Sequence, residues 1–159
     1  MIKIIDNFLD DELLKYITTE MLSENFTWFF CDGKSFIGDD HIQFQHHFYN
    51  HNTINSKYFD SIALPILKKL NYKYIVKVKA NITSKYQTII NHQLHNDVDL
   101  DCNTAILYLN NNDGKTIFEN KEEVNSVKNR MVIFPSSLKH AGTTHTNSKY
   151  RMVINLNYI

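Results

Sequence analysis

The chain has 159 residues, a length that a single folded domain with one sizeable core commonly has. Lysine plus arginine and aspartate plus glutamate each number 17, so the formal net charge is zero and gives no general attraction to nucleic acid or to an anionic membrane. Only four glycines and two prolines, with ten phenylalanines and nine tyrosines, argue against a disordered or collagen-like chain. We therefore expect one domain over residues 1–159.

The N-terminal segment at residues 1–15 becomes charged too early to contain the apolar core of a signal peptide. No apolar run approaches the roughly 20 residues that a transmembrane helix needs. These two features predict a soluble, cytoplasmic protein that has no membrane partner.

The first half of the chain mixes strand-like and helical segments. Asp10 or Asp11 can cap the first helix, whose acidic start suits the positive end of the helix dipole. Pro65 marks either a kink in the second helix or a later start of it. The predicted helices are residues 9–25 and 56–70, the predicted strands are residues 2–8, 26–30 and 42–49, and a turn-rich segment covers residues 32–40.

The second half of the chain is strand-like throughout, with β-branched and aromatic runs divided by Asn, Gly, Asp and Ser. A charged segment at residues 120–130 is predicted to be a turn. The predicted strands are residues 72–83, 104–111, 115–120, 126–136 and 149–159. Helices early and short strands late predict an α+β, mainly β fold that forms a sandwich or a barrel.

His95 and Asp97 are separated by one residue in the segment His-Gln-Leu-His-Asn-Asp at residues 92–97. In extended chain, side chains two residues apart lie on one face, so an imidazole and a carboxylate would point the same way. A further histidine from another strand would complete a two-histidine, one-carboxylate set, which is diagnostic of non-haem Fe(II) oxygenases. The spacing alone is a weak signal, because a polar loop in an asparagine-rich chain produces it too.

Two residues far downstream supply what this pair lacks. His140 follows an apolar run and a Pro-Ser-Ser-Leu turn, and Arg151 stands eleven residues further on in the last predicted strand. In that strand Arg151 shares a face with Val153 and Asn155. A guanidinium among apolar neighbours needs an anionic partner, and its planar shape suits a carboxylate held by two hydrogen bonds. An acidic co-substrate beside a metal fits this pattern.

The order and context of these segments resemble the 2-oxoglutarate- and Fe(II)-dependent oxygenase superfamily, close to its prolyl-4-hydroxylase-like branch. Residues 95–97 stand where that family has His-x-Asp, and residues 114–120 resemble its Gly-Gly-x-Thr-x-Phe turn and strand. Residues 133–142 resemble its Phe-Pro…His segment, and residues 149–159 resemble its closing arginine-bearing strand. The opening residues 2–17 also resemble the strand and helix with which that branch begins.

The resemblance implies a double-stranded β-helix, the cupin-like jelly roll, with one or two N-terminal helices packed on the major sheet. It makes His95, Asp97 and His140 the ligands and catalytic centre of Fe(II), with 2-oxoglutarate and dioxygen as co-substrates. Ascorbate is a further candidate cofactor. The implied reaction is a hydroxylation that releases succinate and CO2, and the chain is expected to be an enzyme, a 2-oxoglutarate-dependent dioxygenase.

Five residues are carried over as candidates to bind the co-substrate. Arg151 would pair with the distal carboxylate of 2-oxoglutarate, and Tyr108 matches a tyrosine that donates a hydrogen bond to it. Tyr86 lies nine residues before His95, near another co-substrate-binding tyrosine of the family. Thr104 shares a strand face with Tyr108, and Asn155 shares one with Arg151, so both are expected to line the same pocket.

The primary substrate is a separate question. The branch favours a protein side chain, a peptide or an amino acid, and nucleic acid is unlikely because net charge is zero and no second arginine follows Arg151 closely. Alternatives are a cupin-like protein that binds a metal or small ligand without turnover, an oxygenase acting on a nucleotide or nucleic-acid base, and a Zn or Mn hydrolase or isomerase. The sequence does not indicate an oligomeric state.

Other polar residues have plainer interpretations. Lys73, Lys77 and Lys79 share one face of a predicted strand, and we interpret it as solvated. His92 is predicted to face away from His95. Either His46 or His47 is expected to face inward, toward the substrate mouth. The other histidines, His41, His51 and His145, are expected to have surface or ordinary polar roles.

The sequence departs from the family pattern in two places: in the turn before the predicted strand at residues 115–120, and between His140 and Arg151. Asp113 precedes Gly114 where the family often has Gly-Gly, and the interval from His140 to Arg151 is longer than in many relatives. The second departure implies an extra loop at residues 143–148. Neither departure removes a candidate ligand.

Overall fold

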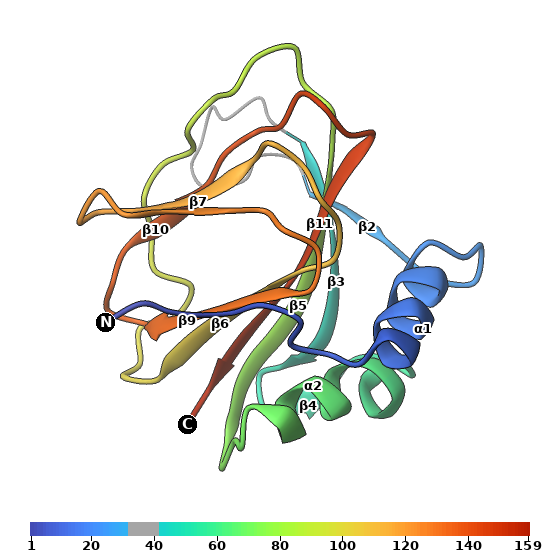
Figure 1. Ribbon diagram of the computed structural model, residues 1–159. Helices are drawn as coiled ribbons and strands as arrows, with labels where there is room; N and C mark the ends of the chain where they lie inside the picture. Colours follow the sequence, from blue (N-terminus) through green and yellow to red (C-terminus); the bar gives the residue numbers. More distant parts are fainter. Residues whose placement is uncertain (32–41) are drawn as a thin grey trace.

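The computed structural model describes residues 1–31 and 42–159, which form two antiparallel β-sheets with helices on one side (Figure 1). The large sheet contains β1 (Lys3–Ile5), β2 (Phe29–Cys31), β3 (Gln43–Asn50), β4 (Thr53–Ile54), β5 (Ile75–Ser84), β6 (Asn103–Tyr108), β9 (Arg130–Pro135) and β11 (Tyr150–Tyr158). The small sheet contains β7 (Lys115–Phe118), β8 (Glu123–Asn125) and β10 (His140–Gly142). The predicted turn-rich segment 32–40 and His41 lie outside the described residues.

The strand order of the large sheet is β1-β9-β6-β11-β5-β3-β2, with β4 paired to β3, and that of the small sheet is β10-β7-β8. The two sheets face each other in Figure 1, with the small sheet drawn above β6 and β9 of the large one. Neighbours in space are far apart in sequence, because β11, the last strand, lies between β5 and β6. This is a double-stranded β-helix, and the expected mainly β fold with helices on the major sheet is confirmed.

The first helix, α1 (Asp11–Met21), begins and packs as its sequence predicts. The Asp10 side chain caps it by accepting a hydrogen bond from the Leu13 amide at 2.9 Å, and acidic residues occupy its first turn. Its buried residues, Leu14, Ile17 and Met21, follow helical spacing.

The second helical segment starts later than predicted. A π-helical turn, η1 (Phe59–Ala63), precedes α2 (Leu64–Lys69), whose first turn contains Pro65. Pro65 thus lies where the chain passes directly from the π-helical turn into α2, with Ala63 already in a helical conformation. Among the described residues, no helix is both long and apolar enough to cross a membrane.

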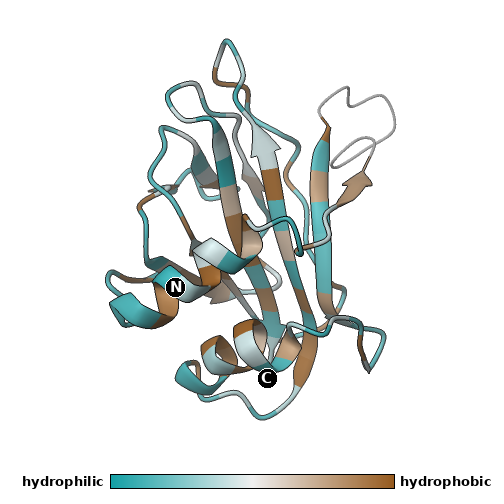
Figure 2. Cartoon of the chain, turned by 90° about the vertical axis from the view of Figure 1, so that its right-hand side faces the viewer, coloured by the Kyte–Doolittle hydropathy of each residue, from teal (hydrophilic) through white to brown (hydrophobic). Residues whose placement is uncertain are grey.

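The helices cover the outer face of the large sheet and enclose the main core (Figures 1 and 2). From the sheet side, Ala80 of β5 and Ile154 of β11, both fully buried, contribute to this core. Because each fully buried aliphatic side chain contributes roughly 1.5–3 kcal/mol, this layer accounts for most of the apolar stabilisation. A smaller core lies around Ile106, Tyr108, Phe118, Phe134 and Val153.

Two strands of the small sheet differ from the sequence-based expectation. The segment 120–130, predicted to be a charged turn, contains β8, which pairs with β7 through Lys115–Asn125, Thr116–Val124 and Ile117–Glu123. β10 was not predicted either, although His140 belongs to it. Both strands have three residues, so they are defined by their pairing with β7 rather than by a local sequence pattern.

Candidate metal centre and its cavity

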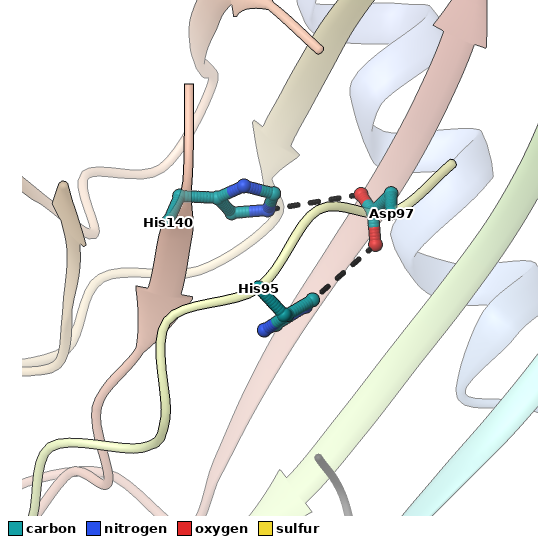
Figure 3. A group of neighbouring side chains, drawn as sticks. All are labelled: His95, Asp97 and His140. Atoms are coloured by element: carbon teal, nitrogen blue, oxygen red, sulfur yellow. Dashed lines mark ion pairs between the residues drawn. The ribbon is translucent and has the colours of Figure 1, made fainter. Parts of the chain in front are cut away.

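Three side chains of types that can bind a metal, those of His95, Asp97 and His140, meet at the edge of the small sheet (Figure 3). His140 opens β10, and His95 faces it across an isolated antiparallel bridge in which each backbone amide donates to the other's carbonyl at 3.0 Å. One potential ligand atom from each side chain lies within 4.8 Å of the other two. The bridge therefore joins the distant histidine to the His-x-Asp segment, as the sequence pattern required.

The donor set fits a divalent cation. Asp97 Oδ1 is 3.8 Å from His95 Nε2, and Asp97 Oδ2 is 3.7 Å from His140 Nε2. His95 Nδ1 lies 3.1 Å from the Gln93 carbonyl oxygen, so a proton on Nδ1 leaves Nε2 free to bind a metal. Asp97 Oδ2 is buried without a hydrogen-bond partner. Metal bonds of roughly 2.0–2.2 Å require only a small contraction of this triangle.

The electrostatics keep these groups in the forms that bind metals. Burial lowers the pKa of His140 to about 4, against an opposing effect of Asp97, so the imidazole is neutral near pH 7. Burial by itself would raise the pKa of Asp97, but the charges around it, with Lys79 the largest contributor, hold that pKa below its usual value. A neutral imidazole and an ionised carboxylate are the states that metal binding requires. Aromatic rings enclose His140, with the Phe134 ring edge-on at 4.8 Å.

Arg151 lies in the same cavity as the two histidines. Its side chain is almost fully buried, and its Nε donates a hydrogen bond to Ser126 Oγ at 3.0 Å. The guanidinium carbon is 5.7 Å from the centre of the Tyr108 ring. Burial lowers the pKa of Arg151, and among the described residues no carboxylate pairs with it. A buried cation without an acidic partner is costly, so this site is suited to an anion that enters from outside.

Two glycines leave room for the arginine. A Cβ atom at Gly114 would approach Asn112 Oδ1 to 2.8 Å and Arg151 Cδ to 3.0 Å, and a Cβ at Gly142 would be 3.4 Å from Arg151 Nη1. The two departures from the family pattern, Asp113 before Gly114 and the longer interval after His140, are in contact with each other. Asp113 Oδ1 accepts a hydrogen bond from the backbone amide of Thr146 at 2.7 Å. The carboxylate at position 113 thus holds the loop at residues 143–148 in place.

The five residues predicted to bind a co-substrate fall into two groups. Arg151 and Asn155 line the cavity, and Asn155 Oδ1 is buried without a hydrogen-bond partner. Tyr108 is fully buried behind it, where its hydroxyl donates to Thr116 Oγ1 at 2.7 Å, and Thr116 lines the cavity.

Thr104 and Tyr86 are not among the residues that line the cavity. Thr104 Oγ1 is buried and accepts a hydrogen bond from Asn157 Nδ2 at 3.0 Å. The backbone amide of Tyr86 donates to the His145 carbonyl at 2.9 Å. The expectation that Thr104 lines the same pocket as Tyr108 is therefore not met, because Thr104 lies further along β6 against Asn157.

Several lining residues were missed or misassigned from the sequence. Lys79, which we assigned to a solvated face, lines the cavity with its Nζ 3.5 Å from Asp97 Oδ1. His92, expected to face away, lines the cavity too, because the segment 92–97 is irregular rather than a continuous strand. Lys79, Asn81 and Thr83 alternate along β5, which indicates that they share one face of the strand. The local sequence does not indicate whether that face lines a cavity or faces solvent.

The adjacent histidines of β3 point to opposite faces. His46 is buried in the main core, with Nδ1 2.7 Å from the Thr27 carbonyl oxygen and Nε2 2.7 Å from Ser56 Oγ. It faces inward as one of the pair was expected to, but toward the core rather than toward the cavity mouth. His47 lies on the other face, opposite Lys79 in the neighbouring strand.

No protein-family model and no curated protein matches the sequence, whereas solved structures match its fold. A 2OG-Fe(II) oxygenase family oxidoreductase from Burkholderia pseudomallei superposes with a TM-score of 0.69 at 11% identity, covering 99% of this chain and 83% of the other. The chain has the fold of the 2-oxoglutarate- and Fe(II)-dependent oxygenases. A Trichoplax adhaerens prolyl hydroxylase in complex with a hypoxia inducible factor peptide has a TM-score of 0.65 at 17% identity, with coverages of 99% and 83%.

A third structure with this oxygenase fold, HygX from Streptomyces hygroscopicus, contains nickel and 2-oxoglutarate. Its TM-score is 0.63 at 12% identity, and the match covers 99% of this chain and 82% of that one. At these identities the likeness establishes the fold. The chemistry of the site is therefore inferred from the side chains of this chain.

Proposed function

We propose that the protein is a non-haem Fe(II)- and 2-oxoglutarate-dependent dioxygenase that hydroxylates a protein side chain, a peptide or an amino acid and releases succinate and CO2. One observation carries the proposal: the buried Arg151 shares a cavity with His95 and His140 of the His95–Asp97–His140 cluster and has no described carboxylate partner. A metal-binding barrel without a dicarboxylate co-substrate has no evident need for this cation.

In this proposal His95, Asp97 and His140 hold Fe(II) through two imidazole nitrogens and one carboxylate oxygen. Such a set occupies one side of a metal and leaves other positions open. The bridge between the His95 and His140 backbones fixes two of the three ligands relative to each other. Asp97, whose side chain is only 2% exposed, is ionised and available.

Arg151 binds the distal carboxylate of 2-oxoglutarate, and Ser126 keeps its guanidinium in position. Asn155 and the Tyr108–Thr116 pair lie close enough to the cavity to contribute polar contacts to the same ligand. The roles of Tyr86 and Thr104 stay predictions, since neither residue lines the cavity.

Bound Fe(II), 2-oxoglutarate and dioxygen together supply the oxidising chemistry, and ascorbate is a candidate to keep the metal reduced. The chain itself positions the ligands, orients the co-substrate and excludes water. The aromatic rings around His140 serve the last of these tasks. The peptide bound to the Trichoplax prolyl hydroxylase supports a peptide or protein substrate here.

The proposal is tested by adding Fe(II) and 2-oxoglutarate to the protein without oxygen and recording the visible spectrum. We expect a weak charge-transfer band that appears only with both components, and we expect His140→Ala to abolish it. Removal of one of three ligands should weaken metal affinity by more than about 100-fold, since even groups that only orient a ligand contribute 10–100-fold.

A band of equal intensity in wild type and His140→Ala, or none in either, would leave the oxygenase proposal without support. Lys85→Ala, an exposed lysine just beyond β5, is a matched control that should retain the band. Succinate release on admission of air then separates an oxygenase from a cupin-like binding protein, which would show the band and no turnover.

A further inference from the structure

Two lysines of β5 enter the polar face that the site occupies. Lys77 and Lys79 are two residues apart and therefore project from the same side of the strand, with His47 of β3 directly opposite Lys79. The Lys79 side chain is only 15% exposed. Lys77 is partly buried on the same face, and burial, followed by the charge of Lys79, lowers its pKa.

The described residues offer these two cations one carboxylate. Asp97 is the group that attracts Lys77, and its Oδ1 is 3.5 Å from Lys79 Nζ, which is long for a charge-assisted hydrogen bond. In the proposed holoenzyme Asp97 is a metal ligand. The charges of Fe(II) and Arg151 would then balance those of Asp97 and the two carboxylates of 2-oxoglutarate, and no other carboxylate in the described part of the chain is paired with either lysine.

We propose that Lys79, supported by Lys77, binds a carboxylate of the primary substrate, so that the substrate is an acidic peptide or an acidic amino acid. The inference rests on the proposed function and deepens it by naming the substrate class. A partly buried ammonium beside a balanced metal site is stabilised by an anion that arrives with the substrate.

The other side chains of this wall favour a polar occupant. The large sheet contributes Gln43, Asn81 and Thr83 to the cavity beside Lys79, and Asn81 Oδ1 is buried without a hydrogen-bond partner. Only Ile106 and Val153 supply apolar surface from these strands. An amide-lined wall with a cation is complementary to a carboxylate and to backbone amides, and it offers little to an apolar side chain.

A single acidic group fits these residues better than a nucleic acid does. Nucleic-acid binding depends on many phosphate contacts and on a basic surface, whereas this chain has zero net charge. The cationic region consists of Lys79, which lines the cavity together with His95 and His140, and of Lys77, which lies on the same strand face beyond the cavity lining. A peptide carboxylate reaches such a site as a side chain, without a chain of phosphates.

The test uses the full chain loaded with Mn(II) under nitrogen, with and without 2-oxoglutarate. It is equilibrated with a mixture of randomised pentapeptides, acetylated and amidated so that only side chains carry charge, together with phosphoserine peptides. Bound and input peptides are compared by mass spectrometry. We expect peptides containing Asp or Glu to be enriched, and we expect Lys79→Met to reduce that enrichment by about tenfold or more, as the loss of a hydrogen bond to a charged group does.

Lys73→Met removes an exposed lysine just before β5 and should leave the enrichment unchanged. Mn(II) and 2-oxoglutarate affinities are measured by calorimetry on the same proteins. Failure of wild type to bind 2-oxoglutarate counts against the proposed function alone, because the peptide measurement is also made without it. Three results overturn the inference: no acidic enrichment in wild type, phosphoserine enriched over Asp and Glu, or Mn(II) affinity that Lys79→Met lowers as much as peptide retention.

Discussion

The two faces of β5 and β11 differ as much as any two regions of this molecule. On the side of the helices, Val78, Ala80, Ile154 and Leu156 are fully buried apolar residues of the main core. On the other side, one residue away along each strand, stand Lys79, Asn81, Arg151 and Asn155. The strand pairing is shared, so the contrast arises entirely from side chains.

The difference separates stability from chemistry. Burial of the apolar face contributes free energy to folding, and few polar atoms there lack hydrogen-bond partners, as is usual in a core. The cavity face contains the side-chain oxygens of Asn81 and Asn155, and Asp97 Oδ2 lies close to it; all three are buried without hydrogen-bond partners. Native proteins depart from polar satisfaction mainly at functional sites, so these atoms mark where ligands are expected.

The largest effect is expected from a cavity on the apolar face. Ile154→Ala removes a fully buried side chain from the main core and should lower the free energy of unfolding by roughly 2–5 kcal/mol. Urea denaturation measures this change. Mn(II) affinity of the folded fraction should stay within a few-fold of wild type, and a loss comparable to that of His140→Ala would show that the two faces are not separable.

Arg151→Met makes the corresponding change on the cavity face. It keeps an unbranched, flexible side chain, although a shorter one, and removes the charge. It should weaken 2-oxoglutarate binding by about 100-fold, or about 2.7 kcal/mol, because the carboxylate would lose a buried charge partner. Stability should stay near wild type or increase, since an unpaired buried cation is removed. Calorimetry with Mn(II)-loaded protein measures the affinity, and unchanged binding would remove Arg151 from the proposed site.

Asp113→Ala tests how much the contact between Asp113 and the loop at residues 143–148 contributes to stability. The carboxylate accepts hydrogen bonds from the backbone amide and the hydroxyl of Thr146, and these interactions hold its pKa below the usual value despite the opposing effect of burial. Their loss should reduce the free energy of unfolding by about 1–2 kcal/mol, measured in urea. Asp6→Ala, which breaks the exposed pair with Arg130, is the control and should cost less. If both variants lost the same free energy of unfolding, the contact between Asp113 and Thr146 would be no stronger than an exposed ion pair.

The smallest effect concerns the one histidine on the apolar face of β3. Burial lowers the pKa of His46 below its ordinary value of 6.5, so between the folded and the unfolded pKa the unfolded chain binds more protons. The free energy of unfolding should therefore fall as the pH drops through 6.5 and level off below the folded pKa. In His46→Gln the slope between about pH 7.5 and pH 5.5 should be shallower. Equal slopes would show that His46 does not contribute to acid sensitivity.

The sequence predicted most of the long elements for identifiable reasons. The first helix had a cap, an acidic first turn and helical spacing, and the long strands had β-branched and aromatic runs. Pro65 indicated a later start of the second helix as one of two alternatives, but the π-helical turn before it was not predicted, because such a turn has no distinct composition. The strands β8 and β10 escaped for a related reason: three residues carry too little pattern to be recognised without their partner β7.

By itself the sequence determined the candidate ligands and the charged partner, because His-x-Asp, a downstream histidine and an arginine on an alternating strand are local chemical patterns. Only the tertiary structure decided which strand faces line the cavity. Alternation assigns residues to two faces but does not say which face is enclosed, and that depends on where the helices and the small sheet pack. Lys79 therefore changed from a solvated residue to a neighbour of Asp97, while Thr104, on a correctly predicted strand, lies outside the cavity lining.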